Sequence, residues 1–183
     1  MGEQHKKHNR REHLNDFHLN VAGEYVYDGA LYACQNDDAK QRRSKRAVWG
    51  MAAILTVAVA AGGCIPAPGM QNCFYVLLPY LGEFLGAASV IWALAKLGTD
   101  WSTVREYNYK KSVAVLPVRT AVTAVFSLLG IVCELIFFFV NDHAGQTFFA
   151  LLYVLLKLIA LLSVLVLRAE IMQAEWDKLP KKN

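Results

Sequence analysis

AVWGMAAILTVAVAAGGCI, residues 47–65, decides the fold class because it is free of charge over nearly the length of a membrane crossing. An α-helix rises ~1.5 Å per residue, so about 20 apolar residues cross about 30 Å of hydrocarbon. Apolar side chains lie all round the expected helix, whereas a surface helix of a soluble domain carries them on one stripe. The stretch predicts a transmembrane helix.

Three more apolar runs of this kind follow, at 73–95, 116–140 and 147–167. Hydrophobic residues make up 55% of the 183-residue chain, above the roughly 45–50% that is usual for soluble domains. The connections 66–72 and 141–146 are short, which favours antiparallel neighbours. We therefore expect an all-α membrane protein, a four-transmembrane-helix bundle made of two antiparallel hairpins.

The distribution of Lys and Arg predicts how the helices are oriented. Basic residues cluster in 40–46, 96–111 and 168–182, while 66–72 and 141–146 contain none. Cytoplasmic flanks carry the excess of positive charge in membrane proteins. Both termini are expected in the cytoplasm of a multi-pass protein of the cell membrane, with the first span itself as the insertion signal.

Basic side chains beside the spans are expected to bind lipid headgroups. The lipid bilayer is thus the first expected partner, since anionic headgroups attract juxtamembrane Lys and Arg. The candidates are Arg42, Arg43, Lys45 and Arg46 before the first span, and Arg119, which is expected to snorkel from the third. These flanks also account for the net charge of +4, so no nucleic-acid partner is expected.

Two polar segments are expected to flank the transmembrane domain 47–168. In the arm 1–46, GEYVYDGALYA (23–33) contains Asp-Gly between two aromatic-rich runs, which predicts a small cytoplasmic β-hairpin. A lone hairpin is marginally stable, so we expect it to pack on the helix ends or on another subunit. The cytoplasmic tail 169–183 is expected to be amphipathic, with residues 168–179 forming a helical continuation of the fourth span.

Ionisable residues inside the spans are the functional lead. Counted from the outer ends of their helices, Glu83, Glu134 and Lys157 lie ~15, ~10 and ~15 Å deep. Side chains lean toward the N-terminus of their own helix, so Glu134 and Lys157 are expected to lean toward each other. Two acids against one base leave a surplus carboxyl group, which we expect to be protonated. The cluster either serves proton-coupled transport or fixes the register of the helices.

The neighbours of Glu83 favour an interior position for its carboxylate. Gly82 and Gly86 form a small-residue face that lets another helix approach closely. Pro79 precedes Glu83 by one turn and is expected to kink the helix beside it.

Cys64 closes the first span and Cys73 opens the second, so both are expected at the outer surface. An oxidising compartment permits a disulfide there. The alternative is a pair of unbonded small residues, because the required Cα separation cannot be read from sequence.

Motifs for catalysis and for cofactors are absent from the sequence. No Ser/His/Asp set, zinc-protease motif or glycine-rich phosphate loop occurs. The spacing of His5, His8, His13 and His18 fits no compact metal site. We expect neither enzymatic activity nor a metal or cofactor.

Two functional hypotheses remain from the sequence. The first is a small transport protein, an oligomeric carrier or channel for a small solute or ion that uses the Glu83, Glu134 and Lys157 cluster. The second is a non-catalytic accessory or regulatory subunit of a larger membrane complex. The expected partners are accordingly further copies of the chain or other subunits.

Overall fold

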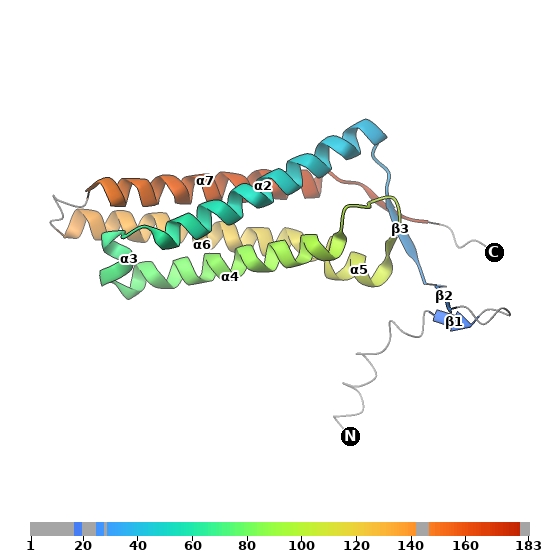
Figure 1. Ribbon diagram of the computed structural model, residues 1–183, viewed down its shortest axis with the longest axis horizontal. Helices are drawn as coiled ribbons and strands as arrows, with labels where there is room; N and C mark the ends of the chain where they lie inside the picture. Colours follow the sequence, from blue (N-terminus) through green and yellow to red (C-terminus); the bar gives the residue numbers. More distant parts are fainter. Residues whose placement is uncertain (1–16, 20–24, 28, 142–146, 180–183) are drawn as a thin grey trace, which may run out of the picture.

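The computed structural model describes residues 17–19, 25–27, 29–141 and 147–179, with the side chains of 17–27 left undescribed. Long helices dominate it and lie side by side (Figure 1). They are α2 (Asp38–Cys64), α4 (Phe74–Leu97), α6 (Leu116–Val140) and α7 (Thr147–Met172). All four are long and apolar enough to cross a membrane. The four predicted apolar helices are thus confirmed.

The helices contact one another in a defined pattern. α6 packs against both α4 and α7, and α2 packs along α7 more extensively than along α4. Small side chains explain the close packing of α2, because its buried face includes Ala52, Ala58 and Gly62. The first long helix therefore has its main partner in the last one, although α4 follows it directly in sequence.

The outward faces of the four helices carry large apolar side chains. Exposed examples occur on each helix, namely Val57, Leu85, Val118 and Leu151. A soluble monomer rarely exposes apolar surface on this scale. Four long helices with exposed apolar faces are typical of a multi-pass membrane protein.

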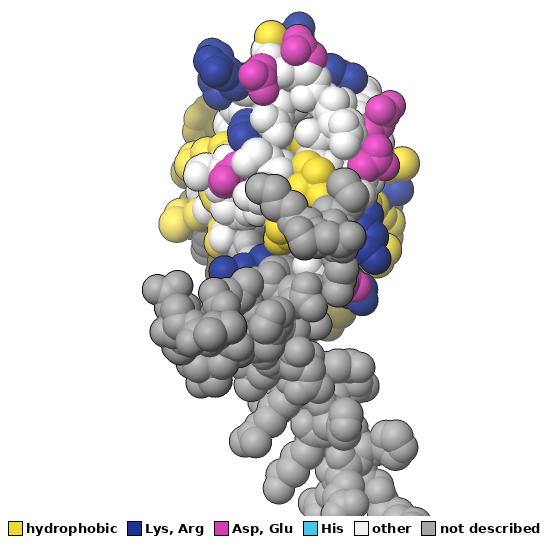
Figure 2. All heavy atoms as spheres, turned by 90° about the vertical axis from the view of Figure 1, so that its right-hand side faces the viewer, with side chains coloured by type: hydrophobic (Ala, Val, Ile, Leu, Met, Phe, Trp, Pro, Cys, Tyr) yellow, Lys and Arg dark blue, Asp and Glu magenta, His cyan; other side chains and the backbone are white. Residues whose placement is uncertain are grey.

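The two ends of the helices differ. At the α3 end, the short helix α3 (Pro68–Asn72) connects α2 to α4, and α6 is followed by α7 (Figure 1). At the opposite end, the sheet end, a small sheet and the short helix α5 (Glu106–Lys111) cover the long helices. Figure 2 looks onto the sheet end and shows Lys and Arg side chains there beside Asp and Glu. Residues 65–73, which form α3 and its flanks, contain no charged side chain.

The sheet at the sheet end unites three distant parts of the chain. Its central strand β3 (Leu31–Cys34) pairs antiparallel with β4 (Val104–Arg105) on one side and with β5 (Trp176–Lys178) on the other. Aromatic rings reinforce it, since Tyr32 stacks on Tyr109 with ring centroids 4.2 Å apart. The sheet thus ties the segment before α2, the α4–α6 connection and the segment after α7 to one another.

The predicted hairpin over 23–33 was wrong. β2 (Tyr25–Tyr27) pairs instead with β1 (Phe17–Leu19), and β3 pairs with β4 and β5. Asp28, in the expected turn, lies outside the described residues, as do the histidines of 1–16. A two-stranded ribbon is marginal by itself, whereas β3 gains two partner strands that are anchored by helices.

The predicted helical continuation of the fourth span over 168–179 is confirmed only as far as Met172 and is wrong beyond it. α7 ends at Met172, and the chain continues as β5. The ring of Trp176 packs 5.8 Å from that of Trp101 and 5.9 Å from that of Tyr109, measured between centroids. These contacts and the bonds to β3 bind the segment to the protein, so it does not form a free amphipathic helix.

A hydrogen bond near the sheet end joins α2 to α7. The buried Ser44 hydroxyl donates to Glu170 Oε2 at 2.8 Å. We expect Ser44→Ala to lower the free energy of unfolding by about 1–2 kcal/mol, because the bond is to a charged acceptor. Denaturant titration in micelles measures this. Thr56→Ala is the matched control, since Thr56 donates only to Ala52 O of its own helix, and an equal loss in both variants would contradict the expectation.

Candidate functional site

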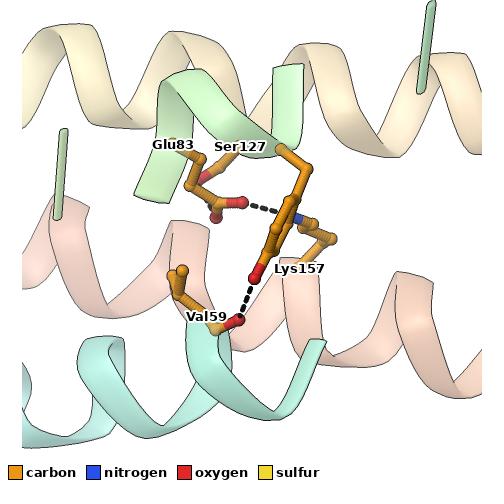
Figure 3. A network of polar contacts seen from close by, with 5 residues as sticks. Val59, Glu83, Ser127 and Lys157 are labelled. Carbon is orange, nitrogen blue, oxygen red and sulfur yellow. Dashed lines mark hydrogen bonds and ion pairs between the residues drawn. The ribbon is translucent and has the colours of Figure 1, made fainter. Parts of the chain in front are cut away.

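A buried ion pair lies among the long helices. Lys157 Nζ of α7 donates to Glu83 Oε2 of α4, and the two side chains are 2% and 0% exposed. Ser127 of α6 donates its hydroxyl proton to Glu83 Oε1 at 2.6 Å (Figure 3). A single carboxylate therefore links three of the four helices.

Two tyrosines complete the surroundings of the ammonium group. Lys157 Nζ lies 4.6 Å from the ring centroid of Tyr80 and 5.0 Å from that of Tyr153, within cation–π range. The Tyr80 hydroxyl donates to Val59 O of α2 at 3.4 Å. Through Tyr80 the network of Glu83, Ser127 and Lys157 also reaches α2, so that it contacts all four long helices.

Glycines on α4 bring this network together. A Cβ on Gly86 would meet Thr123 Oγ1 of α6 at 2.6 Å and Thr123 Cα at 3.3 Å, and one on Gly82 would meet the Phe126 ring at 2.5 Å. The backbones of α4 and α6 therefore approach closely at these glycines, which places Glu83 beside Ser127. Pro79 is buried inside a helix that continues from Phe74 to Leu97, and the predicted kink stays a prediction.

The predicted pairing of Glu134 with Lys157 was wrong, because Lys157 pairs with Glu83. α4 and α7 both begin at the α3 end, and Glu83 and Lys157 lie at nearly the same distance along them. Their side chains also lean in the same direction. The two groups consequently meet at one level, whereas Glu134 lies further toward the α3 end.

Glu134 lies apart from the ion pair, against α3. Its side chain is fully buried, and its Oε1 accepts a hydrogen bond from Gly69 N–H at 3.4 Å. Its Oε2 has no hydrogen-bond partner among the described residues, and the same is true of the buried Tyr153 hydroxyl. The three predicted cluster residues thus divide into a satisfied pair and a separate acid.

The two cysteines at the α3 end are free thiols in the structure. Cys64 is exposed, and Cys73 is half-buried. The disulfide between them stays a prediction, which a count of free thiols under oxidising conditions tests.

The basic side chains expected at headgroups fall into two groups. Arg42, Arg43 and Arg46 are exposed near the start of α2. Lys45 Nζ instead lies 5.7 Å from the ring centroid of Trp101, and Arg119 donates to Ser89 O of α4 at 2.6 Å. Lys45 and Arg119 therefore have protein contacts that the sequence analysis did not anticipate.

Sequence reasoning missed Ser127, Tyr80 and Tyr153. A signal for Ser127 was present in the sequence, because polar residues on α6 recur at helical spacing. Thr120, Thr123, Ser127 and Glu134 all lie on one face of α6 and are fully buried. No comparable signal existed for the tyrosines, since a tyrosine in an apolar run is equally at home facing lipid headgroups.

Comparison with protein-family models, with curated proteins and with solved structures finds no match for this chain. Within residues 29–141 and 147–179, no group of three or more His, Cys, Asp or Glu side chains lies close enough to hold a metal ion. The function is therefore argued from the buried polar groups themselves.

Proposed function

We propose that the chain is a multi-pass protein of the cell membrane that transports a small solute or ion, with the four long helices forming the transmembrane bundle. Their apolar outward faces support insertion. The basic residues of the sheet end, set against uncharged residues 65–73, support cytoplasmic termini under the positive-inside rule. In this orientation the α3 end faces outward.

The observation that carries the proposal is the enclosed Lys157–Glu83 pair, about halfway along α4 and α7. Replacing a buried ion pair with packed apolar side chains is often neutral or stabilising. Stability alone therefore does not require an ion pair at these positions. Ionisable groups inside a membrane typically mark ion and substrate routes. The pair is therefore interpreted as functional.

The geometry supplies a simple exchange chemistry. A proton placed on Glu83 removes the charge that holds Lys157, and the ammonium group then becomes available to an anionic or carbonyl group of a solute. Loss of that proton restores the pair and displaces the solute. The pair is closed to solvent in this conformation, so each exchange requires rearrangement of the helices or of neighbouring copies in an oligomer.

The second candidate function, a non-transporting subunit of a membrane complex, is favoured by one specific observation. The pair and the side chains around it contact all four long helices, as a purely structural clamp would. A flux measurement separates the two functions.

We expect Glu83→Gln to reduce proton-coupled flux at least about tenfold, because the side chain can no longer exchange a proton. The protein is reconstituted into vesicles that contain a pH-sensitive dye, and a panel of small anions, cations and neutral solutes is added outside. The double variant Glu83→Leu/Lys157→Met should lose proton-coupled flux as well. We expect this variant to fold, because apolar side chains replace both members of the buried ion pair.

Glu106→Gln is the matched control for flux. Glu106 forms an ion pair with Lys110 at 2.6 Å in α5, outside the long helices, so its flux should equal that of the unaltered chain. The dye signal of vesicles that contain the unaltered chain is compared with that of empty vesicles for each solute. Equal signals for every solute would overturn the transport function and favour the accessory role.

A further inference from the structure

Glu134 is a buried acid that the proposed exchange at Glu83 does not use. It is 0% exposed, and the structure gives it one hydrogen bond, from Gly69 N–H to Oε1 at 3.4 Å. Its Oε2 has no partner among the described residues. A buried carboxylate oxygen without a donor loses its hydration and gains nothing in return.

Among the residues that the structure describes, the groups that face Glu134 include no available cation. Its neighbour on α6 is Cys133. Helix α3 has no titratable side chain, and the α4 side contributes Cys73, Tyr75 and Glu83. From α7 come Tyr153 and Lys157, and the ammonium group of Lys157 is already held by Glu83. A carboxyl group in these surroundings is stable as the neutral acid, which can also donate a hydrogen bond.

Tyr153 lies on the α3 side of the ion pair, as Glu134 does. It precedes Lys157 by one helical turn, and its ring centroid is 5.0 Å from Lys157 Nζ. The hydroxyl is buried and has no hydrogen-bond partner among the described residues, so proton transfer through it requires the side chains to rearrange.

Helix α3 covers Glu134 from the end of the bundle. Pro68 and Gly69 are buried, and a Cβ added to Gly69 would collide with Glu134 Oε2. With any larger residue at this position the Glu134 carboxyl group would have to shift. Movement of α3 would expose Glu134 to water while the ion pair stays enclosed.

We propose that Glu134 is a proton-binding site at the α3 end, a neutral carboxylic acid that exchanges with outside water and supplies protons through Tyr153 to the Glu83–Lys157 pair. One proton moves in each step. A rearrangement first brings the Tyr153 hydroxyl within hydrogen-bond distance of both acids; neutral Glu134 then donates its proton to the Tyr153 oxygen as that hydroxyl gives its own proton to Glu83. Lys157 is released, and a proton from outside water converts the Glu134 carboxylate back to the neutral acid. The delivery step rests on the proposed transport function.

Infrared spectroscopy of the full chain in lipid vesicles tests the site without any flux. The unaltered protein at neutral pH should show the carbonyl stretch of a buried, protonated carboxylic acid, and the band should shift in D2O as the acid exchanges. Glu134→Gln should remove the band, and Glu83→Gln should retain it. A missing band, or a band that disappears only in Glu83→Gln, would overturn the proposal.

Flux and spectra together separate the two proposals. Loss of flux in Glu83→Gln without a Glu134 band would support the transport function and overturn the proton-binding site. A Glu134 band without any flux in the unaltered chain would support the proton-binding site and overturn the transport function. If both hold, Tyr153→Phe should lower flux while keeping the band, since it removes only the relay hydroxyl; unchanged flux in that variant would overturn the relay step.

Discussion

Replacing Lys157 with methionine is expected to remove about 3–5 kcal/mol from the free energy of unfolding, because the change leaves the Glu83 carboxylate buried and unpaired. Methionine keeps most of the volume of the side chain, so the loss reflects charge and hydrogen bonding more than packing. Denaturant titration in detergent micelles measures the effect. Lowering the pH should reduce it, since protonation of Glu83 then removes the uncompensated charge.

The double variant Glu83→Leu/Lys157→Met is the control for this prediction. It removes both charges and leaves apolar side chains of similar size, so most of the lost stability should return. Ser127 loses its acceptor in this variant, but its hydroxyl can donate to a carbonyl of its own helix. A Lys157→Met variant as stable as the unaltered chain would contradict the structural role of the pair.

Replacing Gly86 with valine is expected to cost about 2–3 kcal/mol, because the added side chain overpacks the contact between α4 and α6. The atoms that a Cβ would meet include Thr123 Cα at 3.3 Å, and backbone cannot rotate away as a side chain can. The displaced α4 would also carry Glu83 away from Ser127. Unfolding in micelles gives the magnitude.

Two other glycines provide graded controls. Gly50→Ala should be nearly neutral, since a Cβ there meets nothing within 4 Å. Gly82→Ala should be intermediate, because the atoms it would meet belong to the Phe126 ring, which can turn aside. An equal cost at Gly50 and Gly86 would contradict close helix approach as the cause.

The apolar part of the fold was readable from the sequence because hydrocarbon imposes a minimum length of uncharged residues. The predicted run 116–140 coincides with α6. α2 begins at Asp38, before the predicted start at residue 47, because the charged residues ahead of the run continue the helix. Apolar patterning marks only the part of a helix that needs an apolar environment.

The ion-pair partner of Lys157 and the partner strands of β3 could not be predicted from the sequence. Glu83, Glu134 and Lys157 were recognised as interior groups, yet which acid Lys157 meets depends on helix direction and on the small-residue contact at Gly86. The central strand β3 was mistaken for half of a local hairpin for a similar reason. Its partners Val104 and Lys178 lie far along the chain, and short-range turn signals carry no information about such pairings.

The position of β3 between β4 and β5 has a consequence for biogenesis. β5 follows α7 in the chain, so the sheet cannot close until the ribosome has delivered all four long helices. Until then the edge of β3 that pairs with β5 is open to other chains or to chaperones, although β4 can already cover the other edge. A chain that ends before Trp176 should therefore keep this edge of β3 unpaired, and faster proteolysis of the truncated chain would show it.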